Sequence, residues 1–95
     1  MTAYLISDVE TRDPEAMARY REAAAASIAQ YGGRYLVRGG PIETLEGGWT
    51  PQAIVVVAFD TADQARAWYA SPEYAQALKV RQTALARRLI LVEGV

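Results

Sequence analysis

The stretch YGGRYLVRGGP, from Tyr31 to Pro41, contains the end of a helix, a strand and a second pair of glycines. Gly32 is placed to end the preceding helix, because glycine readily adopts the left-handed conformation that follows a last helical turn. Gly33 to Gly39 is predicted to be a strand, with Tyr35 and Arg38 on opposite faces unless the strand is bulged. Gly39-Gly40-Pro41 is predicted to bend or bulge the chain.

Upstream of this stretch the sequence predicts a strand and a long helix. Residues 2–9 alternate between strongly apolar and mixed positions, with Tyr4 and Asp8 on the mixed face. Asp13-Pro14-Glu15 joins an N-cap acceptor, a proline at the first helical position and an acid, so a helix begins there. Its apolar stripe recurs at steps of three and four, at Met17, Tyr20, Ala24, Ile28 and Tyr31.

Downstream, three further segments are predicted to be strands. Ile42 to Leu45 continues the strand of the opening stretch, and Glu46-Gly47-Gly48 turns the chain back. Gln52 to Phe59 reads QAIVVVAF, which is apolar on both faces and indicates a central strand covered on both sides. Arg87 to Glu93 ends the chain as a strand, with Leu89 and Leu91 on one face.

Two helix starts lie between the last two strands. Thr61-Ala62-Asp63-Gln64 has the pattern of a capping box, with Ala65, Trp68 and Tyr69 predicted to face inward. Ser71-Pro72 repeats the cap-and-proline signal, so a third helix is predicted to start at Pro72. The stripe of this helix is Tyr74, Leu78, Arg81 and Leu85.

These elements follow one another as β-α-β-β-α-α-β in a single domain, residues 1–95, without repeats or linkers. Short connections and the right-handed crossover rule favour a ferredoxin-like α+β sandwich. Its antiparallel four-stranded sheet has the order 4-1-3-2 and helices on one face. Because the third and fourth strands carry large apolar residues on both faces, the open face needs a cover. We expect a second copy to cover it in a two-fold homodimer.

The composition excludes several classes of chemistry. The 95 residues carry 10 basic and 11 acidic side chains without a run of like charge, so we expect no nucleic-acid partner. The absence of cysteine excludes disulfides and thiol nucleophiles, and the absence of histidine removes the commonest general base and metal ligand. Scattered single carboxylates and isolated glycine pairs predict neither a metal site nor a dinucleotide cofactor.

The location is predicted from the apolar runs and the first residues. No apolar run approaches the ~20 residues that a membrane span needs. The chain opens on a strand-like segment without a basic n-region or an apolar h-region. We therefore expect a cytoplasmic protein with no membrane partner.

Three blocks, YGGRYLVRGG, LEGGW and AWYASPEY, together with the following Arg81, resemble the family named domain of unknown function 1330 (DUF1330). The resemblance implies a dimeric α+β barrel, in a superfamily that also holds cofactor-free monooxygenases, muconolactone isomerases and stress-responsive barrel proteins. The chain departs from the family pattern at Ala58 and Asp60-Thr61, where EFPS-like residues are usual. Because one fold supports many chemistries, the resemblance does not select among them.

Two arginines are candidate ligand-binding residues. Arg38 lies beside a glycine pair, where its guanidinium can bind a carboxylate or phosphate; the alternative is a surface arginine paired with Glu43 or Glu46. Arg81 lies on an otherwise apolar stripe and needs a partner or a wet cavity; the alternative is that it reaches solvent at the helix edge. If both converge between sheet and helices, they form an anion-binding pocket.

Aromatic and acidic residues complete the candidate set. Trp68, Tyr69 and Tyr74 surround the Ser71-Pro72 kink and suit the walls of a flat ligand site, or else belong to the core. Glu46 and Asp8 are the candidate proton carriers, and the alternative for Glu46 is a purely structural turn.

Two functions are compatible with these residues. The first is a homodimeric barrel that binds a small anionic or aromatic organic molecule, with any catalysis independent of a cofactor. The second is a non-catalytic structural or interaction dimer. A filled interior would favour the second function.

Overall fold

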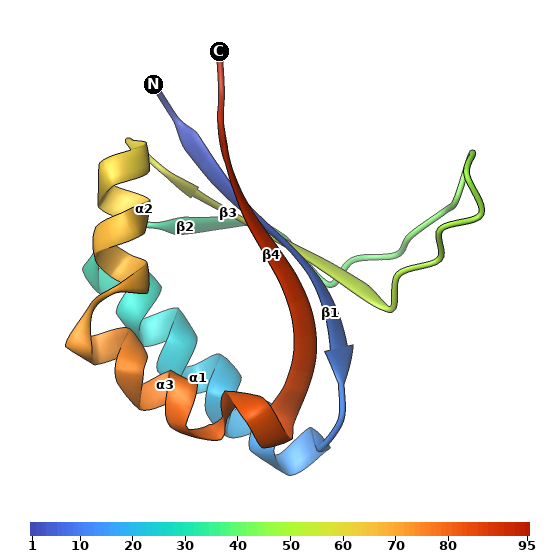
Figure 1. Cartoon of the computed structure of the whole chain (residues 1–95), viewed down its shortest axis with the longest axis horizontal. Coiled ribbons are helices and arrows are strands. Elements are labelled where there is room, and N and C mark those ends of the chain that lie inside the picture. The colour runs from blue at the N-terminus through green and yellow to red at the C-terminus, as the bar shows by residue number, and fades with distance from the viewer.

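The computed structural model describes residues 1–95 and contains one antiparallel sheet with three helices against one of its faces (Figure 1). The sheet order is β2-β3-β1-β4, which confirms the predicted ferredoxin-like architecture and strand order. The elements are β1 (Ala3–Thr11), α1 (Pro14–Gln30), β2 (Arg34–Arg38), β3 (Ala53–Phe59), α2 (Ala62–Tyr69), α3 (Pro72–Ala84) and β4 (Leu85–Glu93).

All three helices begin at the predicted caps. The side chains of Asp13, Thr61 and Ser71 accept hydrogen bonds of 3.0–3.4 Å from backbone N–H groups of the first turn. These N–H groups have no partner within the helix, so the caps satisfy them. The Gln64 side chain does not complete a capping box. Its amide donates instead to the carbonyl oxygen of Tyr31 at 2.7 Å, which joins the start of α2 to the end of α1.

The junction between α1 and β2 depends on two glycines. Gly32 ends the helix in the left-handed region, with φ of +81°. A Cβ atom on Gly33 would lie 2.7 Å from both the Ile28 side chain and the Phe59 ring. Gly33 is therefore required because the edge of the sheet and the end of α1 approach each other closely here.

Strand β2 contains a bulge that changes which of its side chains share a face. Tyr35 lies opposite Val57 and Arg38 lies opposite Val55, so one residue of β2, Leu36, is extra. Val55 and Val57 are two residues apart and point to the same side of the sheet. Tyr35 and Arg38 therefore both face the helices. From the sequence, these two residues could share a cavity only if the strand was bulged, and the bulge is present.

Residues 39–52, which we call the arm, project from the body of the molecule without regular secondary structure (Figure 1). The prediction that Ile42 to Leu45 continues the strand is wrong. Gly39 still donates to the carbonyl oxygen of Ile54 at 3.0 Å, but it turns the chain with φ of +74°, and the rest of the arm pairs with no strand. The turn predicted at Glu46-Gly47-Gly48 is present, with positive φ at both glycines.

The two faces of the sheet differ. The helix-facing side packs into the core, whereas no helix covers the other side, which we call the open face and where Trp49 of the arm lines a hollow with Ile6 and Ile90. Strand register places Ile6 beside Val56 and Ile90 there, and Ile90 is 57% exposed. β3 is central as predicted, but one copy of the chain covers only one of its sides.

Two details of the helices correct the sequence-based prediction. Ala65 and Trp68 are buried, but Tyr69 is 51% exposed rather than inward-facing, because it ends α2 on the outer side. On α3 the buried face runs through Tyr74, Ala77 and Ala84, and Arg81 is only half-buried. No helix of the chain is long and apolar enough to cross a membrane.

Candidate functional site

A cavity of about 510 Å³ lies between the helix-facing side of the sheet and α1. All four strands, α1 and α2 contribute to its wall, and 13 of the 18 lining residues are hydrophobic. Helix α1 packs mainly against α3 rather than on the strands. Several side chains that face the gap are small, among them Ser7, Ala24 and Ala53. Protein interiors rarely leave voids larger than a water molecule, and this volume falls in the range of ligand sites.

The charged residues that line the cavity all have the same sign. Arg21, Arg38 and Arg87 line it, and no aspartate or glutamate does. The salt bridges of the chain involve other arginines: Arg34 with Asp60, Arg66 with Asp63 and Arg88 with Asp8. The three lining guanidinium groups therefore lack a carboxylate partner, and the cavity favours an anion.

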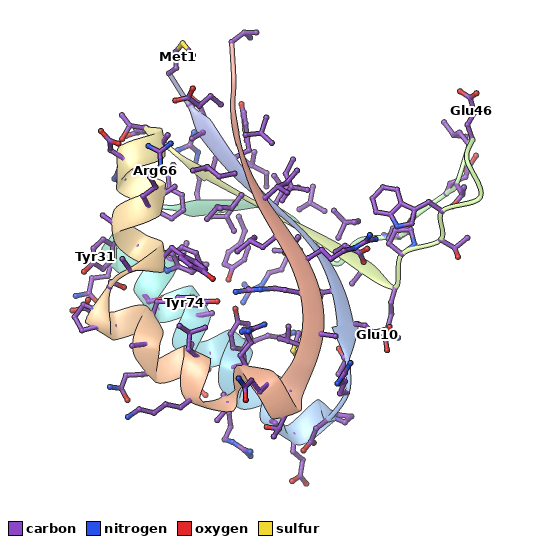
Figure 2. The ribbon with its side chains drawn as sticks, viewed as in Figure 1. Met1, Glu10, Tyr31, Glu46, Arg66 and Tyr74 are labelled. Atoms are coloured by element: carbon purple, nitrogen blue, oxygen red, sulfur yellow. The ribbon has the colours of Figure 1, made fainter.

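Arg87, from β4, is held by two tyrosines from two different helices. Its Nη1 donates to the hydroxyl of Tyr20 at 2.6 Å, and its Nη2 donates to the hydroxyl of Tyr74. The two hydroxyl oxygens are 2.7 Å apart and hydrogen-bonded to each other. Figure 2 shows the Tyr74 side chain extending from α3 into the space between the helices and the sheet. We call these three residues the Arg87 cluster.

Burial and hydrogen bonds shift the pKa of two members of the Arg87 cluster, Tyr20 and Arg87. Burial, with a smaller contribution from Tyr74, raises the pKa of Tyr20 far above its ordinary value, which outweighs the lowering effect of Arg87. Burial by itself lowers the pKa of Arg87, but attraction and hydrogen bonds from Tyr20 and Tyr74 raise it by more. Near neutral pH Arg87 is therefore a cation and Tyr20 carries its proton.

Tyr35 and Arg38 form a second polar part of the cavity wall. The guanidinium carbon of Arg38 lies 4.2 Å from the centroid of the Tyr35 ring, a cation–π contact. Burial raises the pKa of Tyr35, although nearby Arg38 lowers it in part. Arg38 is exposed while Arg87 is half-buried. Arg38 thus lies on the solvent side of the cavity and Arg87 lies deeper.

The structure separates the predicted site residues into two groups. Arg38 and Trp68 line the cavity. Tyr74 does not line it, but its hydroxyl is hydrogen-bonded to Tyr20 and Arg87, which do. Arg81 and Tyr69 do not line it. The expected convergence of Arg38 with Arg81 does not occur, because Arg38 lines the cavity and Arg81 does not.

The two candidate proton carriers also lie away from the cavity. Glu46 is at the far end of the arm (Figure 2). Asp8 is on the open face, where its Oδ2 accepts a hydrogen bond of 2.7 Å from Arg88. Neither carboxylate can reach a molecule held between the sheet and the helices.

Sequence reasoning did not select Tyr20 or Arg87. Tyr20 was assigned to the apolar stripe of the first helix and is indeed buried. Arg87 shares one face of the last strand with Leu89 and Leu91. A charged residue on this apolar face was the signal that could have identified it. The sequence does not show which face of that strand meets the helices.

A family model described as "Domain of unknown function (DUF1330)" matches residues 2–95. No curated protein matches the chain. Among solved structures, the chain is similar to RPA0582 of Rhodopseudomonas palustris, a protein of unknown function. Their identity is 20%, the TM-score is 0.80, and 99% of this chain and 82% of that chain are covered.

Two other structures are similar at lower scores. A dimeric protein of unknown function with a ferredoxin-like fold from Bacteroides fragilis is 19% identical. Its TM-score is 0.66, with 98% of this chain and 96% of that chain covered. SnoaB from Streptomyces nogalater, described as a cofactor-independent oxygenase, is 16% identical. Its TM-score is 0.63, with 99% and 91% covered. At these identities the likeness shows the fold alone.

Proposed function

The chain belongs to the DUF1330 family, which has no assigned activity, and we propose that its cavity binds a small organic anion with an apolar or aromatic body. The observation that carries this proposal is a largely apolar cavity of about 510 Å³ with three arginines and no carboxylate in its wall. Arg87 is the half-buried one of the three and has no ionic partner in the chain, and a bound anion would provide one. Trp68 offers an aromatic surface for a flat molecule.

We also propose that residues 1–95 form a single domain and that two copies of it pack through the open face as a homodimer. The apolar side chains of that face support this, since contiguous apolar patches on a free monomer are unusual. A similar structure from Bacteroides fragilis is described as dimeric. A purely structural dimer was expected to have a filled interior, so the cavity favours the ligand-binding function. That the protein uses no cofactor or metal, and that it is located in the cytoplasm, stay predictions.

A second candidate function is cofactor-free oxidation of the bound molecule by dioxygen. It is supported by the fold shared with SnoaB and by cavity cations that would stabilise an anionic substrate. It ranks second because no carboxylate lines the cavity to remove a proton from the substrate. Oxygen uptake with electron-rich phenols would support it if the uptake disappeared in Arg87→Met. Uptake no faster than without protein would exclude it for those substrates.

A thermal-shift screen of organic acids, amides and amines of similar shape tests the binding function. We expect acids to raise the melting temperature, since a ligand that binds only the folded state stabilises it, and amines not to do so. Either Arg38→Ala or Arg87→Met should weaken the binding of the best acid about tenfold, because one of these two guanidinium groups binds its charged end. Arg66→Ala is the matched control, because Arg66 is an exposed arginine remote from the cavity. If no acid stabilises the protein, or if Arg38→Ala and Arg87→Met both respond like the wild type, the proposed function is wrong.

A further inference from the structure

The Arg87 cluster leaves one hydroxyl proton without an acceptor in the protein. Tyr20 and Tyr74 carry one hydroxyl proton each, and the hydrogen bond between them uses one of the two. Arg87 only donates, so it cannot accept the other. Neither hydroxyl makes any further hydrogen bond. One O–H group therefore points at something that is not part of the chain.

The cavity is where that proton can be used. Tyr74 is completely buried and does not line the cavity, and its hydroxyl has no hydrogen-bond partner except the other two members of the cluster. Tyr20 is 7% exposed and lines the cavity. The arrangement that satisfies most groups has Tyr74 donating to Tyr20, and Tyr20 donating into the cavity. The oxygen of Tyr20 then accepts from both Arg87 and Tyr74, which uses both of its lone pairs.

Arg87 adds charge and further donors at the same place. A guanidinium has five N–H donors, of which the two tyrosines take one each. It stands on β4 with Leu85 and Leu89 on either side in the cavity wall. In such apolar surroundings the attraction between a cation and an anion is stronger than at the surface. The deeper part of the cavity therefore favours anions more than the exposed Arg38 side does.

We propose that Tyr20 and Arg87 form the subsite for the carboxylate of an organic acid, with the Tyr20 hydroxyl donating to a carboxylate oxygen. A carboxylate fits because it only accepts hydrogen bonds and is small enough to leave its apolar body on the surrounding walls. An amide or an alcohol would add a donor where the protein already supplies donors. This inference rests on the proposed function and specifies which residues bind the anionic group.

A matched pair of variants tests the subsite, with 2-naphthoate as the probe. Tyr20→Phe and Tyr74→Phe each remove one hydroxyl from the same cluster, but only the first removes a donor that faces the cavity. Titration calorimetry should show Tyr20→Phe binding 2-naphthoate about tenfold more weakly than the wild type. Tyr74→Phe should change the affinity by less than about threefold, because Tyr20 can still donate to the ligand. Equal losses in the two variants, or no loss in Tyr20→Phe, would overturn the subsite.

A measurement on the wild-type protein covers the case in which a variant fails to fold. With tyrosine labelled at the carbon that bears the hydroxyl, 2-naphthoate should shift the NMR signal of Tyr20 more than that of exposed Tyr69. A Tyr20 signal that does not move while the ligand is bound contradicts the subsite. If 2-naphthoate binds and depends on Arg38 but not on Tyr20, the proposed function stands and only this inference fails. If neither 2-naphthoate nor any acid of the screen binds, both fail.

Discussion

Arg87 is a charged side chain on an otherwise apolar side of its strand, and its neighbours are two phenols rather than a carboxylate. The phenols fix the direction of the guanidinium without neutralising it. A site that must accept an anion needs this arrangement, because an internal carboxylate would compete with the ligand. At the scale of single residues, binding and stability therefore make opposite demands on Arg87.

Replacing Arg87 by methionine should separate those demands. Arg87→Met keeps an apolar chain of similar length and lets the two tyrosine hydroxyls stay paired. We expect the free energy of unfolding to change by less than about 2 kcal/mol, because the two hydrogen bonds that Arg87 donates are lost while a half-buried charge is removed. Binding of 2-naphthoate should be lost. Urea denaturation measures the first effect, and a decrease in stability of more than about 2 kcal/mol would instead assign Arg87 a structural role.

The hydrogen bond between Tyr31 and Glu73 predicts a pH dependence of stability. The Tyr31 hydroxyl donates to Oε1 of Glu73 at 2.7 Å, and this bond lowers the pKa of Glu73. A carboxyl whose pKa is lower in the folded state stabilises the fold above its unfolded-state pKa. That stability is lost as the pH falls through the folded-state pKa. Tyr31→Phe should therefore melt below the wild type at neutral pH and together with it in acid.

Thermal denaturation of both proteins over the acid range checks this prediction. Glu73→Gln serves as the control, since its amide cannot titrate, so adding Tyr31→Phe to it should lower stability by the same amount at neutral and acid pH. A difference between Tyr31→Phe and the wild type that is the same at neutral and acid pH would contradict the assignment.

At the scale of elements, patterns of adjacent residues predicted the helix starts well, but they could not predict how the strands pair. The helix starts at Asp13, Thr61 and Ser71 were predicted because each cap depends on a few adjacent residues. The bulge at Leu36 depends on how β2 pairs with β3, which no local pattern reports. Ile42 to Leu45 has the residue pattern of a strand, yet a strand also needs a neighbour to pair with. The candidate site shares this limit: it joins all four strands and α1, so Arg87 could not be matched to Tyr20.

The junction between α1 and β2 gives a stability prediction at this scale. Gly33→Ala would place a methyl group 2.7 Å from both Ile28 and Phe59, which belong to the core and cannot move freely. We expect the free energy of unfolding to fall by about 1–3 kcal/mol. Gly40→Ala is the matched control, because nothing lies within 4 Å of its Cβ position. It should change stability by less than about 0.5 kcal/mol in urea denaturation. Equal effects of the two changes would contradict the close approach.

At the scale of the whole molecule, the sheet separates two surfaces with different tasks. Its helix-facing side bounds the cavity, and its open face carries exposed apolar residues, among them Ile90 and Val92. A second copy on the open face would complete the cover of β3 without closing the cavity, which lies on the other side. Dimer formation and ligand binding are therefore expected to respond to different substitutions.

Sedimentation of variants tests that separation. Ile90→Lys places a charge among the apolar side chains of the open face, beside Ile6, and should convert a dimer into a monomer. Ala75→Glu, on the exposed side of α3, is the control and should leave the dimer intact. A wild-type chain that sediments as a monomer at micromolar concentration would contradict the proposed dimer.

The central claim is that the cavity selects an organic anion by its charge. Titration calorimetry of the wild-type protein with 2-naphthoate and with 2-naphthamide, its neutral counterpart of the same shape, tests this claim most directly. We expect 2-naphthoate to bind at least about tenfold more tightly, because only the carboxylate gains from Arg87 and the hydroxyl of Tyr20. Equal affinities, or tighter binding of the amide, would show that the arginines of the cavity do not select an anion.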